Sequence, residues 1–174
     1  IRLRNTARIS ASTEAIGEGG NLVIRAPGDI TLQGDGSIAV ATEGAGSAGT
    51  LRINAQNLTL DDGVILTAES QGSGDAGGID IDLTGRLLLQ GGTGISVSSE
   101  RDATAGDIDI DAQRVVLRGG ASLVAETDSG SGADINLRVG DRLVLSNSDI
   151  SAATADGIGG NITLSDLNIL DLNR

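Results

Sequence analysis

The sequence predicts an all-β fold: a right-handed parallel β-helix, a solenoid with three short strands in each rung of about 28 residues and six to seven rungs. Three observations predict it. Aliphatic residues recur in three columns at a nearly constant spacing, and they alternate with polar residues as in strands. Glycine, 27 of the 174 residues, separates the short apolar runs and disfavours long helices. A strand pattern repeated at one period is typical of a solenoid.

The repeat is visible in the residue numbers of these columns. The first predicted strand has spacings of 29, 28, 29, 27 and 27 between Leu22, Leu51, Ile79, Ile108, Ile135 and Ile162. The second has spacings of 29, 28, 29, 28, 28 and 27 between Ile1, Ile30, Leu58, Leu87, Val115, Leu143 and Leu170. The third has spacings of 29, 27, 30, 28 and 27 between Ile9, Ile38, Ile65, Ile95, Leu123 and Ile150. Residues 1–174 are therefore predicted to form a single β-helix segment without caps of its own, and we expect a fragment of a longer repeat protein.

Residues 49–77 show one complete unit. Short runs at 51–53, 58–60 and 65–67 are each followed by a turn or a Gly-rich loop. Three such strands cannot bury a face alone, but equivalent strands stacked about 4.8 Å apart form three parallel sheets around a narrow core. Parallel crossovers predict right-handed winding. We expect small residues at the second inward place of the third strand, namely Ala11, Val40, Thr67, Val97, Ala125 and Ala152.

Two kinds of turn are predicted in each rung. Between the second and third strands, the segments 33–36, 61–63, 90–94 and 118–120 contain glycine, which supplies positive φ at a tight corner. Between the third strand and the next rung lie longer Gly/Ser/Asp segments, such as Glu69–Gly78 and Glu126–Ala133. Their composition favours mobile, solvated loops. A binding face on this edge is the alternative.

The composition excludes several function classes. Phe, Trp, Tyr, Met, Cys and His are all absent, so the chain has no imidazole base, no thiol nucleophile, no zinc site of the usual ligands and no aromatic stacking platform. The formal net charge of -12 disfavours nucleic acid and anionic membranes as partners. No apolar run approaches the ~20 residues of a membrane helix, so membrane insertion is not expected.

Short motifs recur in the same order from unit to unit. They include Gly160-Asn161-Ile162-Thr163-Leu164, the run NLTLDDG at 57–63, ISAST at 9–13 and ISAAT at 150–154. This order resembles the repeats of filamentous-haemagglutinin-like exoproteins, especially the cyanobacterial type. The resemblance covers essentially the whole chain and implies a β-helical stalk or adhesin that is exported by two-partner secretion and secreted or held at the cell surface. The NPNG- or NPNL-type motifs of that family's secretion domain do not occur here, so export is implied by resemblance alone.

Four outward carboxylates of the first strand are predicted to form a two-by-two patch with neighbours about 5–7 Å apart. They are Asp80, Asp82, Asp109 and Asp111. Like charges at this distance repel, so a hard cation such as calcium is one hypothesis. The other is that Arg52 on the rung above and Arg138 on the rung below neutralise the ends of the patch while water screens the rest.

The outward column of the second strand is predicted to expose an apolar strip on three consecutive rungs, formed by Leu88, Val116 and Val144. Such a strip marks a surface for a partner or for lateral self-association. It is equally explained by the β-propensity of a sheet face. The runs 1–3 and 170–172 look like ordinary rung strands, and we expect them to support end-to-end stacking.

The sequence therefore predicts a non-catalytic structural or interaction segment of a secreted or cell-surface β-helical fibre or adhesin. The expected partners are further rungs of the same protein, other copies of the chain, and host or cell-surface glycans or proteins. No catalytic or cofactor-binding residue is predicted, apart from the calcium hypothesis. One alternative is a calcium- or carbohydrate-binding module on the same rod. A second is a polysaccharide lyase or hydrolase, since β-helix enzymes of that kind use acidic clusters.

Overall fold

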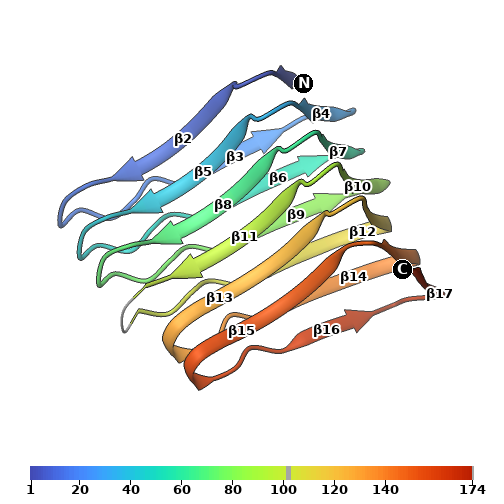
Figure 1. Cartoon of the computed structure of the whole chain (residues 1–174). Coiled ribbons are helices and arrows are strands. Elements are labelled where there is room, and N and C mark those ends of the chain that lie inside the picture. Colours follow the sequence, from blue (N-terminus) through green and yellow to red (C-terminus); the bar gives the residue numbers. More distant parts are fainter. Residues whose placement is uncertain (101–102, 174) are drawn as a thin grey trace.

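The computed structural model describes residues 1–100 and 103–173, and it is an all-β, right-handed parallel β-helix of about six rungs. Figure 1 shows equivalent strands stacked one above another. Followed from the N-terminus, the chain turns clockwise as it moves away, which is the right-handed sense. The fold class predicted from the column spacing is confirmed. None of the described residues forms a helix that is long and apolar enough to cross a membrane.

The strands lie on three faces of the rod. Face A consists of β3 (Leu22–Arg25), β6 (Leu51–Ala55), β9 (Ile79–Leu83), the first halves of β12 (Ile108–Arg118) and β14 (Ile135–Ser146), and β16 (Ile162–Ser165). Face B consists of β1 (Arg2–Arg4), β4 (Ile30–Gln33), β7 (Leu58–Asp61), β10 (Arg86–Gln90), the second halves of β12 and β14, and β17 (Ile169–Asn173). Face C consists of β2 (Arg8–Thr13), β5 (Ser37–Thr42), β8 (Ile65–Ser70), β11 (Gly94–Ser99), β13 (Ser122–Ser131) and β15 (Asp149–Ile158).

The rungs are not all divided into three separate strands as predicted. β12 and β14 run without interruption from face A to face B, so hydrogen bonding joins these two faces into one 11-stranded sheet beside a 6-stranded sheet on face C. In β12 the register against β14 shifts between Ala112 and Arg114. Such a bulge bends a strand locally, which lets the chain turn the corner without leaving the sheet.

Strand pairing confirms the first and second predicted columns and corrects the third in one rung. Ile38 pairs with Leu66, and Leu66 pairs with Ile95. The predicted member, Ile65, is instead 45% exposed, whereas Leu66 is fully buried. Because side chains alternate with period two, an error of one residue exchanges the inward and outward faces of the strand.

The same shift corrects the small inward residue of β8. Ala68, fully buried, takes the place predicted for Thr67 and pairs with Val40 and Val97. The turn before β8 has the usual length, since Leu66 follows Leu60 by six residues, as Ile95 follows Leu89. The error arose because Ile65 and Leu66 are both aliphatic, and the sequence alone does not show which of the two points inward.

Inward residues form continuous aliphatic ladders through the middle of the rod. Leu51, Leu58, Leu66, Leu87 and Ile108 are each fully buried. Burying a large aliphatic side chain contributes about 1.5–3 kcal/mol. Repeated on every rung, this burial makes a core without aromatic residues sufficient.

The corner between the second and third strands holds a column of residues in the left-handed region, and we call it the left-handed corner. Its members are Asn5, Gly34, Asp62, Gly91, Gly119 and Asn147, with φ between 48° and 95°. The predicted role of glycine at this turn is confirmed. Asparagine and aspartate share the column because their side chains tolerate this conformation better than other L-residues do.

The corner between the third strand and the next rung is packed rung on rung, and we call it the stacked corner (43–50, 71–78 and equivalents). The Ala48 amide donates to the Asp75 carbonyl at 2.8 Å, and the Ala76 amide donates to the Thr104 carbonyl at 2.9 Å. Gly72 and Gly74 are buried. These segments therefore are not the solvated loops that their composition predicted. In the later rungs part of the corner is strand, since β13 continues to Ser131.

Candidate functional site

The outward surface of face A is a shallow polar groove of about 480 Å³ across β9, β12, β14 and β16. Its lining includes the four predicted carboxylates and also Asn136, Arg138, Thr163 and Ser165. Asp80 lies beside Asp109 and Asp82 beside Asp111 on neighbouring strands. The two-by-two arrangement predicted from the sequence is therefore present.

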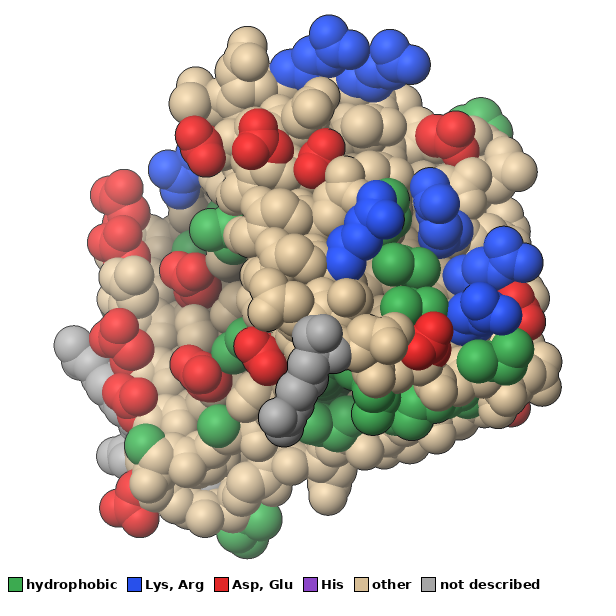
Figure 2. Space-filling model, turned by 45° about the vertical axis from the view of Figure 1, so that its right-hand side comes forward, with side chains coloured by type: hydrophobic (Ala, Val, Ile, Leu, Met, Phe, Trp, Pro, Cys, Tyr) green, Lys and Arg blue, Asp and Glu red, His purple; other side chains and the backbone are tan. Residues whose placement is uncertain are grey.

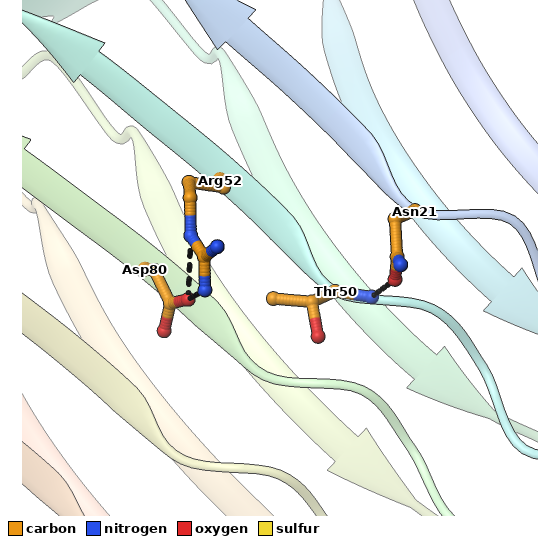
Figure 3. A network of polar contacts seen from close by, with 4 residues as sticks. All are labelled: Asn21, Thr50, Arg52 and Asp80. Carbon is orange, nitrogen blue, oxygen red and sulfur yellow. Dashed lines mark hydrogen bonds and ion pairs between the residues drawn. The ribbon is translucent and has the colours of Figure 1, made fainter.

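Arginines stand at both ends of this carboxylate patch. The Arg52 Nε donates to the Asp80 Oδ2 at 3.0 Å, and its Nη2 contacts the same oxygen (Figure 3). At the other end, the Arg138 Nη1 lies 3.2 Å from the Asp111 Oδ2, and its Nε lies 3.6 Å from Asp166. The interpretation that Arg52 and Arg138 offset the ends of the patch is confirmed. Since all these side chains are partly exposed, each pair contributes no more than about 1 kcal/mol.

The two remaining carboxylates differ in their surroundings. Asp109 accepts a hydrogen bond from the Asn136 Nδ2 at 3.0 Å. Asp82 has no hydrogen bond or ion pair to any residue that the structure describes. Within the same described residues, no group of three or more acidic side chains is placed so that it could hold a metal ion. The calcium hypothesis at Asp80, Asp82, Asp109 and Asp111 stays a prediction.

Polar side chains also connect successive rungs close to this groove. The Asn21 Oδ1 accepts a hydrogen bond from the Thr50 amide at 2.8 Å, as Figure 3 shows. The Asp75 Oδ1 accepts one from the Thr104 amide at 2.9 Å. These side chains cap amides one rung away, so part of the acidic character of the chain is structural.

The predicted apolar strip lies on face B, and its pairing is as expected. Leu88 pairs with Val116, and Val116 pairs with Val144. Val116 and Val144 are half-buried. Leu88 is only 8% exposed, which corrects the prediction that it is exposed. Arg86 and Gln90 lie two residues before and after it on the same face of the strand.

Sequence reasoning missed the arginines around this strip. Arg86, Arg114 and Arg142 form one column beside it. On its other side, the Arg118 Nε donates to the Gln90 Oε1 at 2.9 Å. Figure 2 shows basic side chains grouped around hydrophobic ones on the right of the view. This column could have been predicted from the sequence, because its three arginines are spaced 28 and 28 residues apart, as the rungs are.

The terminal rungs leave the core columns open. At the C-terminal end, inward residues of β16 and β17 are exposed: Ile162 by 44%, Leu164 by 39%, Leu170 by 47% and Leu172 by 63%. At the N-terminal end, Ile1 is 52% exposed. The equivalent residues of the middle rungs are buried. The inward columns therefore extend to the first and last rungs that the structure describes.

Comparison with known proteins gives no match: no protein-family model, no curated protein and no solved structure matches the chain. The resemblance to filamentous-haemagglutinin-like repeats therefore rests on the sequence motifs alone.

Proposed function

We propose that the chain is a non-catalytic structural and interaction segment of a secreted or cell-surface β-helical fibre or adhesin. The observation that carries the proposal is the repetition of one three-strand rung along the whole rod, with inward columns that continue from rung to rung. Leu58, Leu87 and Val115 are successive members of one such column, and each is fully buried. A repeat of this kind forms a rod rather than a closed pocket, as a structural fibre requires.

The form of the rod supports this proposal. The same three strands recur through the chain, so its outward surfaces are long ladders that run along the rod. Extended surfaces of this kind are what repeat proteins use to bind partners. Export and adhesion come from the resemblance to filamentous-haemagglutinin-like repeats, with cell-surface glycans or proteins as the expected ligands.

Localisation tests the main part of the proposal. Antibodies raised against residues 1–174 should label intact, unpermeabilised cells of the source organism or detect the protein in the medium. Protease treatment of intact cells should remove the surface label while leaving a cytoplasmic marker protein untouched. Label that appears only after permeabilisation contradicts the proposal.

A polysaccharide screen tests the non-catalytic part. Incubation with pectin, alginate and related polymers should release no new reducing or unsaturated ends. Release of such ends by the purified rod would favour a lyase or hydrolase. The variant Asp82→Asn, which changes a groove carboxylate that lacks a partner among the described residues, would show whether face A is responsible.

The second candidate function is a calcium- or carbohydrate-binding module, and the polar groove on face A favours it. Carboxylates, hydroxyls and an amide line this groove and can form hydrogen bonds with sugar hydroxyls, while its paired carboxylates are the basis of the calcium hypothesis. Calcium titration with a thermal-unfolding readout tests whether the groove binds calcium. A rise in Tm at millimolar calcium that the Asp82→Asn variant loses would support a calcium site. An unchanged Tm would exclude one.

A further inference from the structure

The rod carries opposite charges on opposite sides. On face B, the arginine patch (Arg86, Arg114, Arg118 and Arg142) surrounds the strip of Leu88, Val116 and Val144. Across the rod, the ends of the face C strands carry an acidic edge that consists of Glu14, Glu43, Glu69, Glu100 and Asp128. Figure 1 shows the stacked corners on the left and face B on the right. In Figure 2 acidic side chains line the left of the view, and basic side chains gather on the right.

Both charged surfaces repeat along the rungs, although the acidic edge is less regular: in the β8 rung Gln71 holds the place of Glu43, and Glu69 stands two residues earlier. Arg86, Arg114 and Arg142 pair directly from β10 to β12 to β14. On the acidic edge, Glu14 and Glu43 directly follow the paired residues Thr13 and Thr42. Since both ladders belong to the same solenoid, they share a repeat of about 4.8 Å. Two rods placed side by side can therefore pair opposite charges on several consecutive rungs.

Most of these charges have no counter-ion within the described part of the chain. Arg114 is the exception, since its Nε lies 2.8 Å from the Asp141 Oδ2. Arg118 is bonded to the neutral Gln90 side chain. Glu14 and Glu43 are exposed and form no ion pair with any described residue. The patch and the edge are thus both available for a charged partner.

Apolar side chains accompany the charges on both surfaces. In the middle of the arginine patch, Val116 and Val144 of the strip are half-buried, and Leu88 is buried beside them. On the stacked corners, Ile16 is 88% exposed and Ile158 is 77% exposed. An anionic polysaccharide would complement only the arginines. A protein surface with acidic and apolar groups would complement both the arginines and the apolar strip. Charge complementarity and the strip together favour a protein partner.

The placement of the two charged surfaces favours one way for two copies to dock. If face B packed on face B, the arginine patch of one copy would face that of the other, and like charges would repel. Docking the patch on the acidic edge instead brings opposite charges together. This contact is heterologous, because it leaves a free edge on one copy and a free patch on the other. Since the two surfaces lie on opposite sides of the rod, the contact does not close.

We propose that the arginine patch of one copy docks on the acidic edge of a second copy, so that rods associate side by side in open rows. A specific interface buries about 800 Å² on each partner, roughly a tenth of the 8249 Å² accessible surface of this chain. The inference goes beyond the proposed function, because lateral association does not depend on export, adhesion or end-to-end stacking.

Charge reversal on each surface tests the proposal. The patch variant combines Arg86→Glu, Arg114→Glu and Arg142→Glu. The edge variant combines Glu14→Arg, Glu43→Arg and Glu69→Arg. A control variant, Arg25→Glu, changes a face A arginine outside both surfaces. Circular dichroism and thermal unfolding establish that each variant is folded, and sedimentation velocity over a concentration series measures association at 50 mM and 500 mM salt.

The wild type and the Arg25→Glu control should associate at low salt and dissociate at high salt, because screening weakens contacts between exposed charges. Each triple variant alone should associate at least tenfold more weakly. An equimolar mixture of the two variants should restore association, since the reversed patch then meets the reversed edge. A variant that fails to fold is replaced by its single change, Arg142→Glu or Glu43→Arg, with a smaller effect in the same direction.

Three results would overturn the proposal. The first is a wild type that stays monomeric over the whole concentration range. The second is a mixture of the two variants that does not recover association. The third is association that survives both variants but is lost in Leu172→Lys, which identifies end-to-end stacking. If the wild type is monomeric and only the patch variant loses binding to immobilised polygalacturonate, the occupant of the patch is an anionic glycan.

Discussion

The two glycine-rich corners of each rung look alike in sequence but use glycine for different physical reasons. At the left-handed corner, Gly119 has a φ of 64°, and the nearest heavy atom to an added Cβ would be the Gly91 nitrogen at 3.5 Å. At the stacked corner, Gly72 lies outside the left-handed region, but its Cβ would overlap the Gly44 carbonyl oxygen of the rung above. One corner needs a backbone conformation, and the other needs the absence of a side chain.

The comparison explains which substitutions each corner tolerates. Asparagine and aspartate take the place of glycine at the left-handed corner, in Asn5, Asp62 and Asn147. A close approach of backbone to backbone admits no such exchange, because any Cβ collides. The stacked corner should therefore be the more sensitive of the two.

The largest effect is expected for Gly72→Ala. The added methyl group would meet the backbone of Gly44, which cannot move without separating two rungs. Overpacking typically costs about 1–3 kcal/mol, and an overlap with backbone atoms should lie at the upper end of that range. Urea unfolding followed by circular dichroism measures the loss.

The matched control is Gly28→Ala, in which no atom lies within 4 Å of the added Cβ and φ is not positive. We expect this change to be neutral, or to stabilise by about 0.4–1 kcal/mol through a less flexible unfolded chain. Equal unfolding midpoints for Gly72→Ala and the wild type would show that the stacked corner is not tightly packed.

The next effect is expected at a hydroxyl that closes the stacked corner. Thr42 is fully buried, and its Oγ1 donates to the Gly46 carbonyl at 2.8 Å. Thr42→Val keeps the shape but leaves that carbonyl without its donor, at a cost of about 1–3 kcal/mol.

Thr93, near the left-handed corner, provides the comparison. It too is fully buried, but its Oγ1 has no hydrogen-bond partner among the described residues. Thr93→Val should therefore be neutral or stabilising. Similar losses in the two variants, measured by urea unfolding, would mean that burial rather than the Thr42 hydrogen bond matters.

The third effect concerns the left-handed corner itself. Gly119→Ala has room for its Cβ but forces a non-glycine residue into the left-handed region, which costs about 1–2 kcal/mol. Gly119→Asn should cost less, since Asn147 occupies the equivalent place one rung on. If alanine and asparagine at position 119 gave the same Tm, backbone strain would not control this corner.

Much of the fold could be predicted from the sequence because the inward columns are chemically uniform. Any Ile, Leu or Val fits an inward place, so a period alone locates columns such as Leu22 to Ile162. The prediction failed where consecutive aliphatic residues offer two candidates for one inward place. Ile65 and Leu66 both suit the column, and only the strand register shows that Leu66 fills it.

The candidate sites were predicted less well, because outward residues are not uniform. The carboxylate patch and its flanking arginines followed from strand register alone. The burial of Leu88 depends on how the outward side chains around it are packed, which no period predicts. The close packing of the stacked corner could not be predicted either. A Gly/Ser/Asp composition is compatible both with a solvated loop and with a close contact between backbones.

The smallest effect is expected on face A, where neither corner constrains the side chains. Asp82 lies beside Asp111 on the next strand and has no hydrogen-bond or ion-pair partner among the described residues. Asp82→Asn therefore removes a contact between like charges and should stabilise the fold by about 0.2–0.5 kcal/mol. Asp80→Asn also relieves repulsion, from Asp109, but it loses the Arg52 contact, so its net effect should be near zero. Urea unfolding at low and high salt measures both. Because the gain at Asp82 is electrostatic, it should shrink as salt rises. A gain that does not change with salt would show that packing on face A, rather than charge, limits its stability.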